Sequence, residues 1–277
     1  MNYSVIIVAA GKGTRTGLTY NKVFYKIGNA PIITQTLKPF LEDADCAKII
    51  MSISPHEQEE FEKIIQSEKI VYVPGGATRQ ESGYLGLQEV DTEFVMIHDG
   101  VRPFLTTKHL EALKAALKTE DAALLMVPLI DTIKEVKGGY VVHTPERSNY
   151  MSAQTPQAFH TELIKKCHEE AKKHPEIVAS DDAMLAELFS DTKIKVVEGS
   201  YRYGACDTRF FYKGIPSDPQ SRLCHRREMR SDHDSGIHLH SSHFRTFSYL
   251  SPRRAVFHPS SAQADFRSGK TIRYRKS

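Results

Sequence analysis

Residues 9–15 combine glycine with basic side chains in a way that suits phosphate chemistry. Gly11 and Gly13 let the backbone approach a phosphate closely, and successive N–H groups there form a concavity that binds anions. Arg15 adds a forked donor for phosphate oxygens, and Lys22 adds a compact positive charge. The spacing matches neither the GxxxxGK[ST] loop nor the GxGxxG dinucleotide fingerprint. We therefore predict a phosphate-binding loop, with a purely structural turn as the alternative.

A second glycine-rich loop covers residues 75–82 and precedes a helical pattern. The adjacent Gly75 and Gly76 would allow backbone contacts to a flat base. The hydroxyl of Ser82 would be able to hydrogen-bond the edge of that base. The alternative is a turn that only caps the following helix. The residues by themselves leave both interpretations open.

Asp99 places a carboxylate directly after an apolar run, within residues 98–103. This position suits Mg²⁺, which proteins bind through carboxylates together with substrate phosphates. The alternatives are a helix cap or a salt bridge to Arg102, and His98 is more typical of a satisfied half-buried histidine than of a base. Residues 131–132 and 155–157 end later segments and are typical of turns. Neither a Ser-His-Asp set nor a His/Cys metal cluster is evident in the sequence.

Short apolar runs alternate with amphipathic helical patterns over residues 1–200. We predict strands over residues 3–10, 48–53, 70–73, 93–98, 122–128 and 193–197. We predict helices over residues 31–41, 55–67 (with Ser54 as its N-cap), 81–89, 107–118, 161–173 and 180–189. This alternation indicates an α/β fold with a mostly parallel sheet covered on both faces. Since such sheets bind ligands at the carboxyl ends of their strands, we expect the loops described above to meet in one cleft.

Residues 131–152 depart from this alternation. Two short runs, 132–136 and 140–143, flank Lys137-Gly138-Gly139, and this arrangement is a hairpin signal. A hairpin inserted into an α/β domain is expected to project from it as a β-arm.

The composition, 40% hydrophobic and 26% charged, is that of a soluble globular protein. No apolar run approaches the roughly 20 residues of a membrane span, and the N-terminus has no signal-peptide pattern. The 4 cysteines are far apart and form no CxxC pair, which indicates free thiols. We therefore expect a cytoplasmic protein with no membrane partner.

The charge changes sign along the 277-residue chain. Residues 203–277 hold about 14 Lys or Arg against about 6 Asp or Glu, whereas the preceding residues hold about 23 against about 28. Arginine also replaces lysine as the main basic residue, and no sustained strand or helix period is present. We predict one folded domain over residues 1–202 and a disordered or foreign segment over residues 203–277.

Taken in order, the motifs of residues 1–202 resemble those of the 2-C-methyl-D-erythritol 4-phosphate cytidylyltransferases of the non-mevalonate isoprenoid pathway. The matching residues are Ala9-Ala10-Gly11-x-Gly13-x-Arg15, Lys22, Gly75-Gly76-x-x-Arg79-Gln80-x-Ser82, His98-Asp99-Gly100-x-Arg102-Pro103, Asp131-Thr132 and Gln154-Thr155-Pro156-Gln157. The resemblance implies a three-layer, Rossmann-like nucleotidyltransferase fold with a β-arm. It also implies transfer of CMP from CTP to methylerythritol phosphate, with release of pyrophosphate.

The resemblance also implies residue roles. The catalytic residues would be Arg15 and Lys22, which would stabilise charge on the α-phosphate. Nucleotide-binding residues would be Ala9, Ala10, Gly11, Gly13, Gly76, Ala77 and Ser82. Asp99 would bind Mg²⁺, and the sugar phosphate would contact Arg102, Thr132, Arg147, Thr155 and Ser180. The family is dimeric through the arm, so Arg147 would reach the substrate of the partner subunit in a homodimer.

Two features depart from the family pattern. Asn21 stands before Lys22 where the family usually has proline, and we expect a mild loss of loop rigidity. After Tyr201 the family continues with a strand whose lysine contacts substrate and triphosphate, and that strand is missing here. Lys195 is no substitute, because it lies on the preceding strand. We interpret residues from about 203 onward as a frame-shifted tail; the alternative is a genuine basic extension that binds nucleic acid nonspecifically.

Three other functions stay open at this point. Ribitol 5-phosphate cytidylyltransferases share the loop, aspartate and arm signatures, so ribitol 5-phosphate is the alternative acceptor. The missing strand would also be consistent with an impaired enzyme. A nucleotide- or RNA-binding module that uses the basic tail is the non-enzyme alternative, although we do not expect nucleic acid as a partner.

Overall fold

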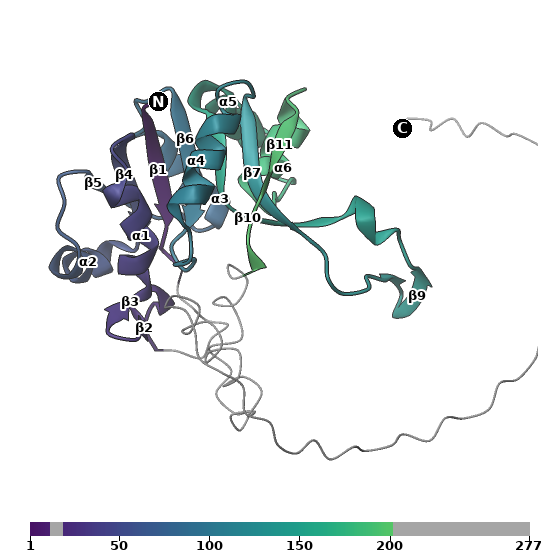
Figure 1. Ribbon diagram of the computed structural model, residues 1–277, viewed down its shortest axis with the longest axis horizontal. Coiled ribbons are helices and arrows are strands. Elements are labelled where there is room, and N and C mark those ends of the chain that lie inside the picture. The colour runs from purple at the N-terminus through teal and green to yellow at the C-terminus, as the bar shows by residue number, and fades with distance from the viewer. Residues whose placement is uncertain (12–18, 202–277) are drawn as a thin grey trace, which may run out of the picture. The chain divides into compact units, whose positions relative to one another are not determined.

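The computed structural model describes residues 1–11 and 19–201 (Figure 1). Gly13 and Arg15, predicted above to bind nucleotide and to stabilise charge, lie outside the described residues. The same holds for the tail predicted from residue 203 onward.

A seven-stranded sheet forms the centre of the domain, in the order β11-β7-β10-β6-β1-β4-β5. The pairs β1–β4, β1–β6, β4–β5 and β7–β11 are parallel, so the mostly parallel sheet expected from the sequence is confirmed. The strands are β1 (Tyr3–Val8), β4 (Cys46–Ile53), β5 (Ile70–Pro74), β6 (Phe94–Asp99), β7 (Ala122–Pro128), β10 (Met151–His160) and β11 (Ile194–Glu198).

Strand β10 was missed by the sequence analysis, which assigned its residues to the arm and a turn. It runs antiparallel to both β6 and β7, with Phe159 opposite Val95 on one side and Ala122 on the other. Its sequence, MSAQTPQAFH, loses its polar–apolar alternation at Thr155 and contains a proline, which weakens a strand prediction. The strand exists because both of its edges are paired by neighbours that lie far away in the sequence.

Helices cover both faces of the sheet, and each face has its own apolar core. Leu37, Phe61 and Leu110 pack on one face, from α1, α2 and α4. Leu87, Ile164 and Leu185 pack on the other, from α3, α5 and α6. The predicted three-layer α/β fold is thus confirmed, with helices α1 (Ile32–Glu42), α2 (Gln58–Ile64), α3 (Arg79–Leu87), α4 (Thr107–Ala116), α5 (Thr161–Lys172) and α6 (Asp182–Phe189).

None of the helices in the described ranges has the length and apolarity needed to cross a membrane. The helices predicted to start at residues 31, 81 and 180 start instead at Ile32, Arg79 and Asp182, and one further helix start differs in kind. The expected helix over residues 55–67 is a 3-10 turn, η3 (Pro55–Glu57), followed by α2, and Ser54 makes no side-chain capping hydrogen bond. Proline in the first turn fixes the start of this segment without a hydroxyl cap.

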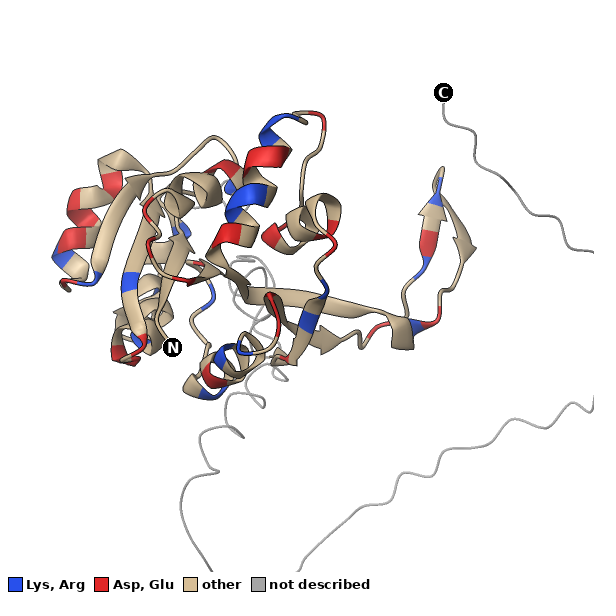
Figure 2. Cartoon of the chain, turned by 90° about the horizontal axis from the view of Figure 1, so that it is seen from above, with Lys and Arg blue, Asp and Glu red and all other residues tan. Residues whose placement is uncertain are grey.

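The arm is a two-stranded hairpin, β8 (Glu135–Lys137) and β9 (Tyr140–His143), followed by a 3-10 turn, η4 (Arg147–Asn149). Gly138 and Gly139 both adopt positive φ, 60° and 85°, as a two-residue hairpin turn requires. The arm projects from the sheet in both views (Figures 1 and 2). The predicted arm is therefore confirmed, and it presents large apolar side chains that are mostly exposed: Val136, Tyr140, Val141 and Val142.

Candidate active site

The carboxyl ends of β1, β5 and β6 bring three of the predicted loops together. A Cβ atom added to Gly75 would collide with the side chain of Ala10, so only glycine lets these two loops approach so closely. Gly100, after β6, donates its N–H to the carbonyl of Val8 at 3.0 Å. A Cβ atom on Gly100 would lie 3.1 Å from that of Ala9. The loops therefore converge at one edge of the sheet, as the strand order requires.

The loop before α3 is held in place by its own hydrogen bonds. The N–H of Gly76 donates to the hydroxyl of Ser82 at 3.0 Å, and the N–H of Ala77 donates to the Glu81 carboxylate at 2.7 Å. Thr78 caps the helix by accepting from the N–H of Glu81 at 3.0 Å. The hydroxyl of Ser82, which is 3% exposed, donates to the carbonyl of Thr78. The loop therefore caps helix α3, and these bonds also give the Gly76–Ala77 backbone a defined shape.

Asp99, at the end of β6, is held between two guanidinium groups. Arg79 Nε donates to Oδ1 at 3.2 Å, and Arg102 Nε donates to Oδ2 at 2.9 Å. The salt bridge to Arg102 that the sequence left as an alternative therefore exists. Burial opposes ionisation, but the two guanidinium groups outweigh it and lower the pKa of Asp99 to about 2. Asp99 is therefore a carboxylate at any physiological pH.

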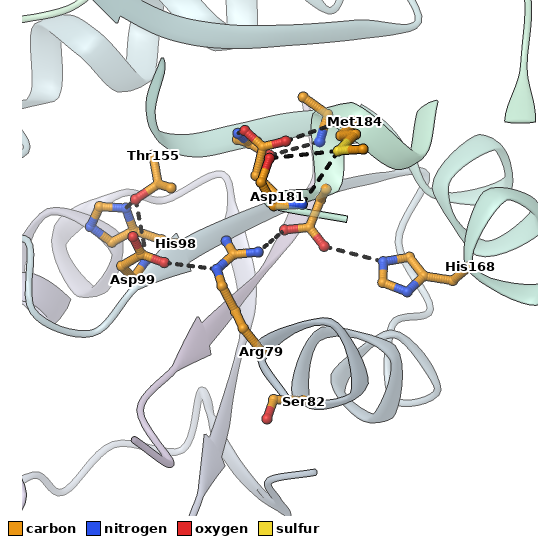
Figure 3. Close-up of polar contacts among 12 residues, drawn as sticks. Arg79, Ser82, His98, Asp99, Thr155, His168, Asp181 and Met184 are labelled. Carbon is orange, nitrogen blue, oxygen red and sulfur yellow. Dashed lines mark hydrogen bonds and ion pairs between the residues drawn. The ribbon is translucent and has the colours of Figure 1, made fainter. Parts of the chain in front are cut away.

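Arg79 also binds a second carboxylate, on the other side of its guanidinium (Figure 3). Its Nη1 donates to Asp182 Oδ2 at 2.7 Å, and His168 Nε2 lies 3.2 Å from the other oxygen of Asp182. Both side chains of the His168–Asp182 pair are only 1% exposed. Burial disfavours the charged forms, yet the contacts lower the pKa of Asp182 and raise that of Arg79. These contacts form one series of side chains, His168–Asp182–Arg79–Asp99–Arg102, which holds the Asp99 carboxylate in place.

One hydrogen-bond donor atom of this network is not used by the contacts described above. The Nη2 atom of Arg79 is buried and has no hydrogen-bond partner among the residues that the structure describes. A buried donor without a partner costs free energy, so such atoms are rare and call for a ligand or water. An anionic or hydroxyl-bearing ligand bound beside Asp99 would satisfy it.

His98 lies under Asp99 and is fully buried between two polar partners. Its Nε2 is 3.2 Å from the carbonyl of Arg102, and since a carbonyl only accepts, this nitrogen carries the proton. Nδ1 then accepts from the hydroxyl of Thr155 at 2.9 Å, and this hydroxyl in turn accepts from the N–H of Asp99. Thr155 therefore orients the Asp99 backbone. His98 is a satisfied histidine, as the sequence suggested, but it is fully buried where the sequence suggested half-burial.

The protonation of His98 is expected to destabilise the fold in mild acid. Burial lowers its pKa to about 4, and the charge of Asp99 opposes that shift only in part. The unfolded chain, with a histidine pKa of about 6.5, therefore binds more protons between about pH 6.5 and about pH 4, so stability falls as pH decreases through that window. The loss would reach about 3 kcal/mol, at 1.36 kcal/mol per pKa unit. Asp99 adds a further loss only below about pH 4, as the pH falls toward its own pKa.

Urea unfolding at several pH values measures this effect. His98→Gln keeps a donor and an acceptor without a titrating ring, so its free energy of unfolding should change less between about pH 6.5 and about pH 4 than that of the natural chain. His56→Gln, at an exposed position, is the matched control and should keep the natural slope. Equal slopes for the natural chain and His98→Gln would contradict the assignment.

The structure brings most of the predicted site residues to this edge of the sheet. Gln157 also ties the start of α6 to β10, because its amide donates to Asp181 and accepts from the N–H of Ala183. Ser180, which precedes α6, is exposed, and its hydroxyl donates to the sulfur of Met184. The residues at the edge are Ala9, Ala10, Gly11, Gly76, Ala77, Ser82, Asp99, Arg102 and Thr155.

Two predicted substrate residues lie elsewhere. Thr132 and Arg147 are exposed residues of the arm, and Arg147 donates to the carbonyl of Ile130. Lys22 begins a 3-10 turn, η2 (Lys22–Phe24), that follows Asn21. Asn21 in turn hydrogen-bonds the carbonyl of Ala9, so Lys22 follows a residue that is tied to the first loop.

Sequence reasoning assigned no role to Arg79, Asp182 or His168. The signal for Arg79 was present, since it begins helix α3 three positions after Gly76, at the edge of the sheet where Asp99 lies. Asp182 is the first residue of α6, after the N-cap Asp181, and aspartate is common in the first turn of a helix whatever its function. His168 had no local signal, because its partner lies on another helix.

The described residues contain no group of three or more His, Cys, Asp or Glu side chains arranged to hold a metal ion. A divalent cation at this site would therefore depend on Asp99 and on oxygens supplied by a ligand.

Comparisons with known proteins agree with this geometry. A model of the family described as 2-C-methyl-D-erythritol 4-phosphate cytidylyltransferase matches residues 3–203. Proteins of that name from Bacillus cytotoxicus and Bacillus velezensis are each 42% identical to the chain, over 72% and 73% of its length and 89% and 88% of theirs. The match ends where the described part of the chain ends, within two residues.

Solved structures agree as well. The crystal structure of 4-diphosphocytidyl-2C-methyl-D-erythritol synthase from Anaerococcus prevotii superposes with a TM-score of 0.66 at 32% identity, covering 73% of this chain and 88% of that one. The 2-C-methyl-D-erythritol 4-phosphate cytidylyltransferase of Francisella tularensis gives a TM-score of 0.65 at 27% identity, over 82% and 99%. The chain belongs to the 2-C-methyl-D-erythritol 4-phosphate cytidylyltransferase family.

Proposed function

We propose that this protein transfers CMP from CTP to 2-C-methyl-D-erythritol 4-phosphate and releases pyrophosphate, in the synthesis of isoprenoid precursors. Family membership over residues 3–203 supports the reaction. The observation that carries it is the ionised Asp99, held by Arg79 and Arg102 at the edge where the glycine-rich loops meet. Such a site offers fixed charges to a phosphorylated ligand.

The reaction needs positioning more than proton transfer. A phosphate oxygen of the acceptor attacks the α-phosphorus of CTP in line, a new P–O bond forms, and the bond to the bridging oxygen of the β-phosphate breaks. Pyrophosphate leaves with the electron pair. The acceptor phosphate is already an anion, so no general base is required. His98 suits this scheme, since both of its nitrogens are occupied and its pKa of about 4 keeps it neutral.

We assign the two catalytic roles to Lys22 and Arg15, which would stabilise the negative charge that builds up on the α-phosphate. Backbone groups of Ala9, Ala10, Gly11 and Gly13 would line the nucleotide, as the close approach of these loops supports.

On the other side of the nucleotide, Gly76 and Ala77 would select cytosine through backbone contacts. Ser82 contributes by holding the N–H of Gly76, which fixes the shape of the loop that reads the base. Direct contact of the Ser82 hydroxyl with the base would use its one remaining lone pair.

Magnesium is the cofactor that we propose, bound by Asp99 together with triphosphate oxygens. The donor set fits, because Mg²⁺ prefers carboxylate and phosphate oxygens. Asp99 accepts one N–H on each oxygen, and an ionised carboxylate offers about four acceptor positions, so some remain for a cation. When bound, the ion supplies positive charge near the phosphates. The two guanidinium groups beside Asp99 repel a cation that arrives alone, so Mg²⁺ should bind only together with the nucleotide.

The acceptor side of the site would combine Arg102, Thr155 and Ser180 of one subunit with the arm of another. We propose a homodimer in which Arg147 and Thr132 act across the interface. Two observations support this arrangement: both residues lie on a projecting arm, and β9 carries no Lys, Arg, Asp or Glu (Figure 2). Tyr140 of β9 is 80% exposed, and exposed apolar side chains grouped in this way are typical of protein–protein contacts.

Mixing two inactive variants tests the dimer. Lys22→Ala removes a proposed catalytic group from its own site, and Arg147→Ala removes one that would act in the partner's site. Co-expressed as a mixed dimer, they should restore one intact site, whereas neither variant alone should be active. Light scattering that gives a monomer mass, or mixed dimers without recovered activity, would reject the arrangement.

The cytoplasm is the compartment that we propose. The buried thiols of Cys46 and Cys167 are free, as suits a reducing compartment.

For residues from about 203 onward we propose a shifted reading frame, supported by the abrupt change in composition at the point where the family match ends. Resequencing the gene tests this: an alternative frame that encodes the family's strand supports it, and the absence of one rejects it.

Pyrophosphate release from CTP tests the reaction itself. The folded protein, with Mg²⁺, should release pyrophosphate when 2-C-methyl-D-erythritol 4-phosphate is added and much less with ribitol 5-phosphate. A preference for ribitol 5-phosphate would reassign the acceptor. CTP binding without release would identify an impaired enzyme, and salt-sensitive RNA binding without CTP binding would favour a binding module.

A further inference from the structure

Asn21 is a buried side chain at the end of the glycine-rich loop, only 4% exposed. One amide hydrogen-bond donor atom, Nδ2, serves two acceptors: the carbonyl of Ala9 at 2.7 Å and the carboxylate of Glu57 at 2.9 Å. Its Oδ1 accepts from the N–H of Val23 at 3.3 Å and so caps the turn η2. Three of the four hydrogen bonds that an asparagine can make are therefore formed.

These bonds join segments that the chain order separates. Ala9 follows β1 and begins the predicted phosphate loop, Asn21 stands at the far end of that loop, and Glu57 belongs to η3 after β4. Asn21 thus ties the two ends of the loop to each other and to the turn η3 that follows β4. Lys22 is the next residue, so the same hydrogen bonds fix the position of its backbone.

We propose that Asn21 is a positioning residue that sets the place of Lys22 relative to the nucleotide loop. The inference rests on the proposed function of Lys22. The sequence predicted a mild loss of loop rigidity from Asn21 in place of the family's proline. Under this proposal Asn21 instead supplies rigidity through its hydrogen bonds.

The chemistry of the site requires an amide. The Ala9 carbonyl and the Glu57 carboxylate only accept, so they need a side chain with two N–H groups. Aspartate would add a second negative charge beside Glu57, and alanine or proline would leave both acceptors without this donor. Restoring the family's proline is therefore expected to impair this chain.

A double-mutant cycle between Asn21 and Lys22 tests the proposal. Asn21→Ala should lower kcat about tenfold, with a smaller change in KM for CTP, because it disturbs a group proposed to act in the transition state. In a Lys22→Ala background, Asn21→Ala should lower kcat no further. Asn21→Pro should behave as Asn21→Ala does. Independent, multiplying losses in the cycle, or full activity of Asn21→Pro, would overturn the proposal.

Two further variants separate positioning from general stability. Asn29→Ala, at an exposed position eight residues later, should keep natural kinetics. If Asn21→Ala does not fold, Glu57→Ala removes only one of the two restraints and should give a smaller loss of kcat that also disappears without Lys22. All rates are compared below the unfolding transition of each variant.

A readout that needs no turnover distinguishes failure of this proposal from failure of the proposed function. Hydrogen exchange of the Val23 amide should be faster in Asn21→Ala than in the natural chain, since its acceptor is gone. Faster exchange in a chain without transferase activity would reject the function and keep Asn21 as the organiser of this segment. Unchanged exchange would overturn the proposal whether or not the chain is active.

Discussion

Lys22→Ala is expected to lower kcat by about 10²–10³-fold, which is the cost of removing one preorganised group that stabilises developing charge. KM for CTP should change much less, because the interaction is proposed to strengthen only in the transition state. The backbone at Lys22 is fixed by the turn η2 and by Asn21 before it, so truncation removes charge without releasing the loop end. Steady-state kinetics with CTP and 2-C-methyl-D-erythritol 4-phosphate measure both constants.

Lys26→Ala is the matched control for that variant. Lys26 is an exposed lysine four residues later, on the short strand β2 (Lys26–Ile27), which pairs with β3 (Ala30–Pro31). Loss of this charge should leave kcat within about twofold of its natural value, since an exposed lysine away from the site contributes little to charge stabilisation there. Equal losses for the two variants would show that general positive charge matters, and a natural kcat for Lys22→Ala would remove Lys22 from the mechanism.

Asp99→Asn is expected to lower kcat/KM by about 10²-fold or more. Asparagine has the same shape but no charge, so Arg79 and Arg102 would lose the partner that holds both guanidinium groups. The proposed Mg²⁺ would lose the carboxylate that we assign to it, and the Mg²⁺ concentration for half-maximal rate should rise about 10–100-fold. A magnesium titration of the rate at saturating CTP measures this shift.

Asp91→Asn controls for the loss of one carboxylate. Asp91 is 68% exposed and pairs with Lys48 on the surface, so the change should leave the rate and its magnesium dependence intact. If Asp99→Asn lowers the rate but keeps the natural magnesium dependence, Asp99 serves to hold the arginines and the cation is bound elsewhere.

The local signals in the sequence predicted most of the fold. Six strands of the central sheet, its helices and the hairpin at Gly138-Gly139 follow from periodicity, proline and paired glycines within short windows. The carboxyl-end rule for parallel strands also predicted that Asp99 lies near the glycine-rich loops. Strand β10 was missed because its pairing partners, β6 and β7, determine it more than its own residues do.

The sequence by itself determined the family, the α/β architecture and the residues available for chemistry, because these depend on residue types and on spacings of a few positions. The partners of the charged groups were decided only by tertiary structure. Arg79 meets Asp182 across 103 positions, and Asn21 meets Glu57 across 36. Burial then changes what those groups do: it keeps His98 neutral, and the arginine contacts outweigh it to keep Asp99 charged. Such pairings depend on strand order and on exclusion of water, which no local stretch of sequence specifies.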